Sequence, residues 1–282
     1  MRVSDWGEYV HGIAAQMALY RESARRLCEL AGLRPGMAVV DLGAGTGLAG
    51  LAALELVPEG LELVVVEPNP SLLAAARARI GDRAGAYHTV DPVAAADLVP
   101  GKVDRVICNL ALLSFRDPEG VLRAWRNRIK PTGRFCFSLS GTYFNVLRDQ
   151  VTPQYVFIQE LHRQGLLPRG LPSVERLPNQ RSVEGTLKGA GYKPARYEVQ
   201  EIPTARPETE PGGELYNLMR IHPALPGKDH RDAVERTLAA LPAAAPAIAS
   251  RGARWQVVHF VAQPALTPEE LLLERFGGGP PG

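Results

Sequence analysis

Cysteine is scarce in this chain of 282 residues, which contains three, at Cys28, Cys108 and Cys136. Their number is odd, they are widely spaced in apolar or helical surroundings, and none forms a Cys-x-x-Cys or Cys/His cluster. Cysteines in this pattern build neither a disulfide framework nor a zinc site. We therefore expect three reduced packing residues.

The chain also lacks a long apolar run and an excess of charge of one sign. Its apolar stretches fall short of the roughly 18 residues that a membrane span needs, and residues 1–8 lack the apolar core of a signal peptide. We therefore expect a soluble, cytoplasmic protein with no membrane partner. Since 32 basic and 30 acidic side chains nearly balance, we interpret the basic group at 123–130 as a solvated helix face rather than a nucleic-acid footprint.

Short apolar segments alternate with helical ones in the first half of the chain. Helical spacing predicts an amphipathic helix at 17–31, and Asn69-Pro70 and Asp117-Pro118 are typical helix starts. The expected buried strands are 38–42, 61–66, 103–108 and 134–139. This alternation predicts an α/β fold with a mostly parallel sheet and helices on both faces.

The pattern weakens after the strand that ends at residue 139. A helix at 182–190 and strands at 195–202 and 255–262 are separated by stretches rich in Pro, Arg, Gln and Ala. These stretches hold one expected helix each, at 154–164 and 231–241, and Thr267 opens a further short helix before a flexible tail. We therefore expect helical insertions after the fifth strand and between the sixth and seventh.

These elements divide the chain into a main domain and additions to it. We expect an N-terminal helical lid at 1–36 and a nucleotide-binding core at 37–140. An insertion that caps the substrate follows at 141–181, and the chain returns to the core at 182–202. A second cap insertion at 203–254, an edge strand at 255–263 and a C-terminal helix with a tail at 264–282 complete the chain.

A glycine-rich run, Asp41-Leu42-Gly43-Ala44-Gly45-Thr46-Gly47, follows the first expected strand. Glycines at this point let the chain turn sharply into a helix while its backbone meets a ligand without interference from Cβ atoms. The dinucleotide fingerprint requires another glycine at position 48, where this chain has Leu48. The run predicts a nucleotide-type cradle, and a strand-to-helix turn without a ligand is the alternative.

Acidic and amide residues follow the neighbouring strands. Glu67 ends the second strand, where a carboxylate can accept hydrogen bonds from both ribose hydroxyls, although an exposed strand-end charge is the alternative. Segments 87–91 and 106–110 end on Asp91 and on Asn109-Leu110. Because carboxyl ends of parallel strands meet at one sheet edge, all of these residues should line the same site.

The order of Asp41 to Gly47, Glu67, Asp91, Asn109 and Lys130-Pro131-Thr132-Gly133 resembles the class I S-adenosylmethionine-dependent methyltransferases, over about residues 24–262. The resemblance implies a Rossmann-like, seven-stranded, mostly parallel sheet whose strand at 255–262 runs antiparallel beside the fifth and sixth. It also implies methyl transfer from S-adenosylmethionine, leaving S-adenosylhomocysteine, to a small organic acceptor. Transfer to oxygen or nitrogen is favoured over transfer to carbon, on family frequency alone.

The resemblance further implies a set of cofactor contacts. The glycine backbone would meet the methionine part, Glu67 the ribose, and Asp91 the adenine amino group, with Asp97 as an alternative to Asp91. Asn109 would lie under the sulfonium, and residues 130–133 match the turn before the fifth strand. The cofactor-binding residues implied are Asp41, Gly43, Ala44, Gly45, Thr46, Gly47, Glu67, Pro68, Asp91, Asn109, Leu110, Tyr9 and Tyr20.

Catalytic candidates are fewer, because the donor is already a strong electrophile and the protein mainly has to position the acceptor. An acceptor that starts protonated still needs a general base. We select His222 and Tyr216 in the late insertion, since a histidine has a near-neutral reference pKa; a structural or exposed histidine is the alternative. Tyr9 and Tyr20 cover the cofactor or, alternatively, belong to an apolar stripe, and Arg181 is an acceptor anchor or a surface charge.

The sequence contains features that argue against some other functions, and it leaves two others open. Asn109-Leu110-Ala111-Leu112 is not the pattern by which base-modifying enzymes hold an exocyclic amine, and no Asp-Asn pair follows strands four to six to hold Mg²⁺, so we predict no metal. Leu48 argues against a nicotinamide dehydrogenase. A protein or RNA methyltransferase and a catalytically silent, S-adenosylmethionine-binding regulator stay open. We expect a small-molecule substrate and a monomer or homodimer.

Overall fold

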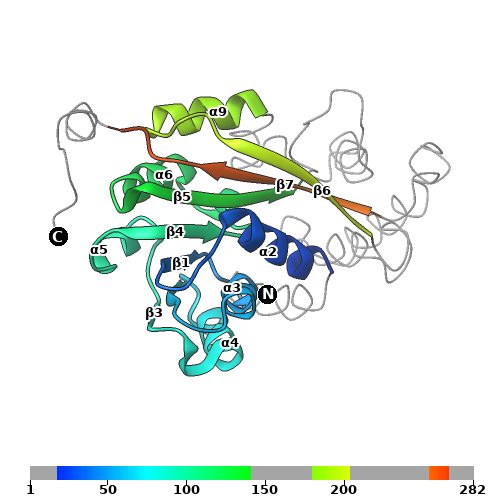
Figure 1. Ribbon diagram of the computed structural model, residues 1–282, viewed down its shortest axis with the longest axis vertical. Coiled ribbons are helices and arrows are strands. Elements are labelled where there is room, and N and C mark those ends of the chain that lie inside the picture. Colours follow the sequence, from blue (N-terminus) through cyan, green and yellow to red (C-terminus); the bar gives the residue numbers. More distant parts are fainter. Residues whose placement is uncertain (1–17, 141–179, 204–253, 267–282) are drawn as a thin grey trace, which may run out of the picture.

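The computed structural model describes residues 18–140, 180–203 and 254–266, and their strands form a single sheet (Figure 1). The strand order is β3-β2-β1-β4-β5-β7-β6. The first five strands are parallel, and β7 runs antiparallel between β5 and β6, which confirms the predicted Rossmann-like sheet. The strands are β1 (Ala38–Leu42), β2 (Glu62–Val66), β3 (Ala86–His88), β4 (Val103–Cys108), β5 (Ile129–Ser140), β6 (Arg196–Pro203) and β7 (Arg254–Ala262).

Helices cover both faces of this sheet, with α2, α3 and α4 against one face and α5, α6 and α9 against the other. Two 3₁₀ turns, η1 (Gly81–Arg83) and η2 (Leu112–Ser114), join strands to helices. The helices are α2 (Ala18–Ala31), α3 (Leu48–Leu56), α4 (Pro70–Ile80), α5 (Ala95–Leu98), α6 (Pro118–Arg126) and α9 (Gln180–Gly189).

Apolar residues follow one another along the central strands, without alternating polar residues, because both faces of the sheet are buried. Side chains alternate between faces along a strand, so Val39 and Ile107 pack with α2 and α3, whereas Val40 and Val106 pack with α6 and α9. Two apolar clusters result, one on each side of the sheet. The three cysteines are free and buried, as predicted.

Two helix starts have the predicted caps. The side chain of Asn69 accepts hydrogen bonds from the first-turn N–H groups of α4, and that of Asp117 accepts from Gly120 in α6. Pro70 and Pro118 occupy the first helical positions, where a missing N–H has no consequence. Local sequence therefore fixes both junctions between strand and helix.

The prediction of a turn at residues 130–133 is wrong, because this segment lies inside β5. The pairing of β4 with β5 shifts register there, between Val103 opposite Ile129 and Arg105 opposite Arg134. A Cβ atom at Gly133 would lie 2.9 Å from the Asp104 carbonyl oxygen. The Pro and Gly that suggested a turn therefore accommodate an irregularity within the strand.

Helix α2 packs against one face of the sheet and runs antiparallel to β4 (Figure 1). At its C-terminal end, Arg105 Nε donates to the Ala31 carbonyl oxygen at 2.6 Å, and near its start Asn109 Nδ2 donates to the Tyr20 carbonyl oxygen at 3.3 Å. The first turn of α2 therefore reaches the carboxyl edge of the sheet. This edge is where the predicted site residues end their strands.

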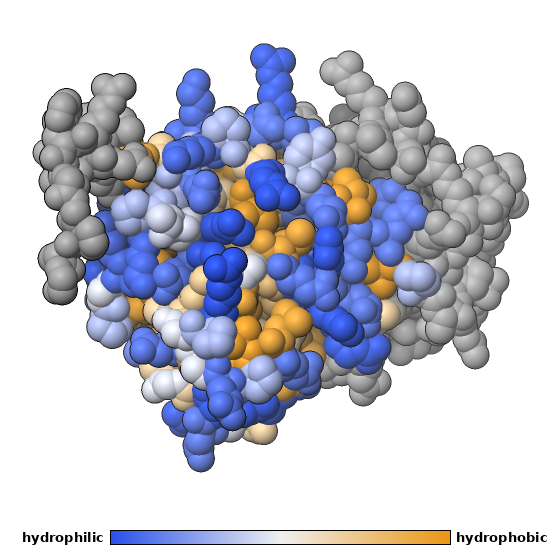
Figure 2. Space-filling view, viewed as in Figure 1, coloured by the Kyte–Doolittle hydropathy of each residue, from blue (hydrophilic) through white to orange (hydrophobic). Residues whose placement is uncertain are grey.

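The face of the molecule that is seen in Figure 1 has a mainly hydrophilic surface, with apolar residues exposed between the polar ones (Figure 2). In the described ranges, no helix combines the length and the apolar character required to cross a membrane. The helices expected at 154–164, at 231–241 and from Thr267, and with them both insertions, lie outside the described residues.

Candidate functional site

The glycine loop between β1 and α3 has a backbone that only glycine adopts readily. Gly43, Gly45 and Gly47 have φ angles of 71°, 55° and 82°. The Gly43 N–H donates to the Val66 carbonyl oxygen at 2.9 Å, which holds the loop against β2. The spacing noticed in the sequence therefore reflects three left-handed positions in one turn.

The loop also has close neighbours. A Cβ atom at Gly43 would lie 2.7 Å from Ala111 Cβ and from Phe115 Cζ, and one at Gly47 would lie 3.0 Å from Ala76 Cα. Side chains larger than hydrogen are therefore excluded by the turn after β4 and by α4. Glycine is required at these positions by sterics as well as by φ.

Glu67 lies beside the loop at the end of β2 and is 6% exposed. Its Oε2 accepts from the Gly45 N–H at 2.8 Å, and its Oε1 accepts from the Asn69 N–H at 2.9 Å. Burial raises the pKa of this carboxyl group, while the two N–H donors oppose the rise. Glu67 is therefore a fixed acceptor that faces the loop rather than an exposed strand-end charge.

Asp41 lies in β1, two residues before the loop, and is 1% exposed. Its Oδ2 accepts from the Gly50 N–H at 2.7 Å, and its Oδ1 has no hydrogen-bond partner among the described residues. Burial raises its pKa to about 7, and the charge of Glu67 adds to this rise. Asp41 is therefore an incompletely satisfied buried acid.

Asn109 and Leu110 connect the end of β4 to neighbouring elements. Ser138 Oγ of β5 donates to Asn109 Oδ1 at 2.7 Å and accepts from the Leu110 N–H at 2.9 Å. Asn109 also donates to the carbonyl of Tyr20, which begins α2. Leu110 has a φ of 55°, the single positive value at a non-glycine residue in the described segments, so the backbone turns sharply where the strand ends.

The remaining predicted cofactor residues lie around the loop or outside the described structure. Arg79 donates to the carbonyl oxygen and hydroxyl of Thr46, and Pro68 is exposed after Glu67. Asp91 is exposed, and its Oδ1 accepts from the Val93 N–H at 2.8 Å. The other predicted site residues, Tyr9, Tyr216 and His222, lie outside the described residues.

A polar row under α2 was not predicted from the sequence. His259 of β7 is fully buried, faces Ser138 and Glu198 across the strands, and shares a 2.8 Å hydrogen bond between its Nε2 and Gln200 Oε1. Glu198 accepts two hydrogen bonds, of 2.6 and 2.8 Å, from the Arg26 guanidinium. The available signal was a buried polar residue in each of two largely apolar strands, Ser138 in β5 and His259 in β7.

No set of three His, Cys, Asp or Glu side chains within the described part of the chain is arranged to hold a metal ion. The site offers backbone N–H groups, two buried carboxylates and one oriented amide at the carboxyl edge of a parallel sheet. Such an edge, where the strand order reverses between β1 and β4, is the usual ligand position in open α/β sheets.

Comparisons with known proteins agree on one kind of domain. A family model described as a methyltransferase domain matches residues 40–135. The ubiquinone/menaquinone biosynthesis C-methyltransferase UbiE of Shewanella frigidimarina is 27% identical over 191 residues, which are 64% of this chain and 75% of that protein.

Solved structures resemble the chain in fold. One is a chain from the complex between the Haloferax volcanii Trm112 methyltransferase activator and a methyltransferase, with a TM-score of 0.56, 19% identity and coverage of 94% of this chain and 99% of that one. Another is the Haemonchus contortus phosphoethanolamine N-methyltransferase 2 with S-adenosyl-L-methionine, with a TM-score of 0.50, 16% identity and coverage of 87% and 53%.

Proposed function

Because the chain belongs to the class I S-adenosylmethionine-dependent methyltransferases, we propose that it methylates a small organic acceptor at oxygen or nitrogen. The observation that supports this most is the carboxyl-edge site, where the left-handed loop 43–47 lies between two buried carboxylates. We infer the acceptor class from the basic residues that the structure describes at 123–130, three of which have acidic partners.

The described residues fit the donor. Loop 43–47 presents backbone to the methionine part without Cβ interference, and the two oxygens of Glu67 can accept from the ribose hydroxyls. Asn109 is held at the carboxyl end of β4 by Ser138 and by the Tyr20 carbonyl. We propose that it lies under the sulfonium region, with Asp91 on the adenine side of the donor and Tyr20 on the α2 side. The unpartnered Oδ1 of Asp41 is a buried acceptor that a cationic ligand would help to compensate.

When bound, the donor supplies an electrophilic methyl group on a cationic sulfur. The protein then has to align the acceptor with that group and exclude water, and positioning of this kind contributes up to about 7–11 kcal/mol. We assign removal of an acceptor proton to His222 or Tyr216, both of which belong to the insertion at 203–254.

A carbon acceptor is the second candidate, and the curated relatives favour it because they are named C-methyltransferases. Methylation of carbon removes a proton from the acceptor carbon, so that reaction depends on a base more strongly than methylation of a neutral amine does. A new carbon–methyl bond in the labelled product would favour this candidate, and a new oxygen–methyl or nitrogen–methyl bond would exclude it.

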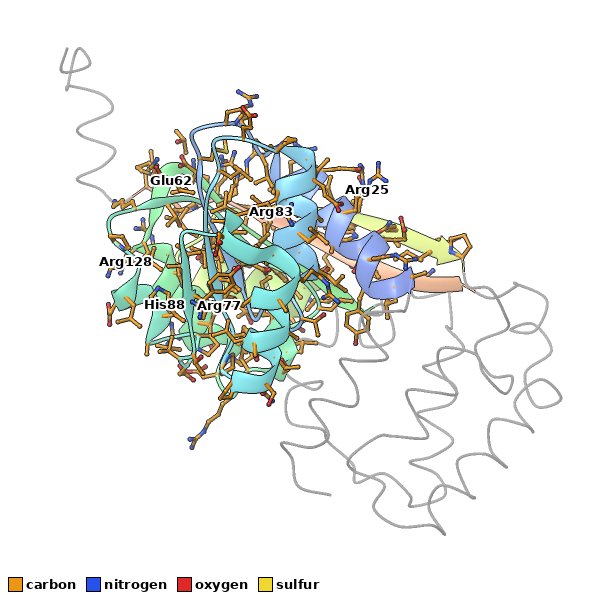
Figure 3. The ribbon with its side chains drawn as sticks, turned by 90° about the horizontal axis from the view of Figure 1, so that it is seen from below. Arg25, Glu62, Arg77, Arg83, His88 and Arg128 are labelled. Atoms are coloured by element: carbon orange, nitrogen blue, oxygen red, sulfur yellow. The ribbon has the colours of Figure 1, made fainter. Side chains whose placement is uncertain are left out.

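The described basic residues of the 123–130 group do not favour a macromolecular acceptor, because three of them have acidic partners. Arg123 pairs with Glu119, Arg128 lies 3.7 Å from Asp97, and Lys130 donates to Asp104. In Figure 3, Arg25 and Arg128 lie on opposite sides of the described part of the molecule, with Arg77 and Arg83 between them. We therefore propose a small-molecule partner and no nucleic acid, with the protein acting as a monomer or homodimer.

The test has two parts. Isothermal titration should detect binding of S-adenosylmethionine and S-adenosylhomocysteine, and incubation of a cell extract with donor labelled in its methyl group should yield a small molecule that gains that methyl group. Absence of binding by both ligands would refute the donor site, and exclusive labelling of protein or RNA would refute the acceptor class.

A matched pair of variants locates the site. Glu67→Gln, at the carboxyl end of β2, should weaken donor binding by about tenfold, because a hydrogen bond to a charged acceptor contributes about 1.5–3 kcal/mol. Glu62→Gln, exposed at the opposite end of the same strand, should leave it unchanged. Equal effects of the two substitutions on donor affinity would show that Glu67 does not bind the donor.

A further inference from the structure

Two buried carboxylates flank the glycine loop without a basic partner. Asp41 lies under the loop on the α3 side and Glu67 beside it on the β2 side. Among the ion pairs of the described residues, none involves either carboxylate. Two acids in one buried site without a cation favour a positively charged ligand.

Asp41 has a structural role that uses one of its oxygens. α3 begins after Gly47, which has no side chain to cap the helix, and Asp41 Oδ2 supplies an acceptor for the Gly50 N–H in the first turn. An amide oxygen would serve this role equally well. Capping of α3 therefore explains neither why an ionisable carboxyl group is buried at position 41 nor why its Oδ1 has no partner.

The groups around Asp41 do not supply a compensating charge. Glu67 contributes a like charge, and the Cys28 thiol of α2 and the Cys108 thiol of β4 remain neutral because burial raises the pKa of each. The pKa of Asp41 is raised to about 7, chiefly by its burial. Without a ligand, the carboxyl group is therefore about half protonated near pH 7 and protonated at acidic pH.

Building on the proposed donor site, we propose that Asp41 selects the donor by charge: binding of the cationic donor releases the Asp41 proton to solvent, and the carboxylate takes up a proton again after the neutral product leaves. The attraction between the sulfonium and this carboxylate acts across the loop in a site of low dielectric. The product is a thioether with no charge on sulfur, so it stabilises the carboxylate less. Asp41 is therefore a positioning residue that favours donor over product.

Proton linkage gives the expected pH dependence. The donor lowers the pKa of Asp41, so donor affinity rises with pH through about 7 and levels off above it. Below the lowered pKa, the group is protonated in both states and affinity is at its minimum. The total gain is about tenfold for each unit by which the donor lowers the pKa.

The experiment measures proton release directly. Titration of S-adenosylmethionine into the full chain near neutral pH, in buffers of different ionisation enthalpy, should show release of a fraction of a proton. S-adenosylhomocysteine should show a smaller release and a flatter pH profile. Equal release and equal pH profiles for the two ligands would refute the proposal while leaving the donor site intact, and absence of binding by both would refute the two together.

Asp41→Asn is the matched variant, because its amide oxygen can still accept from Gly50. It should lose the Asp41 contribution to proton release, and its preference for donor over product should fall by at least threefold. Subtraction of its titration from that of the natural chain removes the contribution of the ligand's own amino group. An Asp41→Asn variant that folds and retains both the release and the preference would refute the proposal.

Discussion

The two ends of the interface between α2 and the sheet differ in chemistry. At the C-terminal end of the helix, Leu27 and Ala31 are fully buried against Val39, Ile107 and other apolar residues. Nearer its N-terminal end, the carbonyls of Tyr20 and Glu22 accept hydrogen bonds from Asn109 and Gln200, and Arg26 in the middle of the helix pairs with Glu198 of β6. The apolar end accounts for stability, and the polar end fixes the helix start in one position beside the proposed donor site.

The largest effect on stability is expected at the apolar end. Ile107→Ala should lower the free energy of unfolding by about 2–5 kcal/mol, because a fully buried side chain is replaced by a cavity. Ile107→Val should cost about 0.5–1.5 kcal/mol. Chemical denaturation measures both. Donor affinity of the folded variants should stay unchanged, and a parallel loss of affinity would show that the two ends are not separable.

The next effect concerns pH at the polar end. Burial lowers the pKa of His259 from 6.5 to about 4, so the unfolded chain binds a proton that the folded chain excludes between these values. Stability from this group is complete above pH 6.5 and declines by about 3 kcal/mol as pH falls to 4. Denaturation across this range should show a smaller decline in His259→Gln. An unchanged decline would assign the pH dependence elsewhere.

Asn109→Ala tests the link between β4 and the helix start. It removes the acceptor of the Ser138 hydroxyl and the donor to the Tyr20 carbonyl, so unfolding free energy should fall by about 1–3 kcal/mol. Hydrogen exchange should speed up in the first turn of α2, and donor affinity should fall. The exposed Asn127→Ala is the control and should stay within about 0.5 kcal/mol. Equal effects would contradict a specific link.

The smallest effect is expected for the pair of Arg26 and Glu198. A double-mutant cycle to alanine should give a coupling of about 0.2–1 kcal/mol, because both side chains are partly exposed. The hydrogen bonds from Arg26 lower the pKa of Glu198 below its ordinary 4.5, so the coupling is present above about pH 4.5 and is lost as pH falls through the lowered value. A coupling that persists in strong acid would contradict this origin.

The features predicted correctly are those that depend on neighbouring residues. The apolar strands, the caps at Asn69 and Asp117, and the glycine spacing at 43–47 each act within one turn or strand. The antiparallel strand at 255–262 was predicted because the resemblance to a family supplied its pairing, which no local pattern contains.

The features that sequence reasoning missed depend on contacts between distant segments. Arg26 and Glu198 are 172 positions apart, and His259 and Gln200 are 59 apart. Their meeting requires the register of β5, β7 and β6, which the separate strands do not encode. The misread segment 130–133 has a similar cause, since its Pro and Gly are explained by the irregular pairing with β4.

The central position of β7 has a consequence for synthesis of the chain. β6 precedes β7 in the sequence, yet in the described sheet it is joined to β5 only through β7. Until Arg254–Ala262 has left the ribosome, β5 exposes an open edge and β6 has no strand to pair with. Such an edge is a template for aggregation. A nascent chain that stalls before residue 254 would therefore depend on chaperones, although its donor loop is already complete.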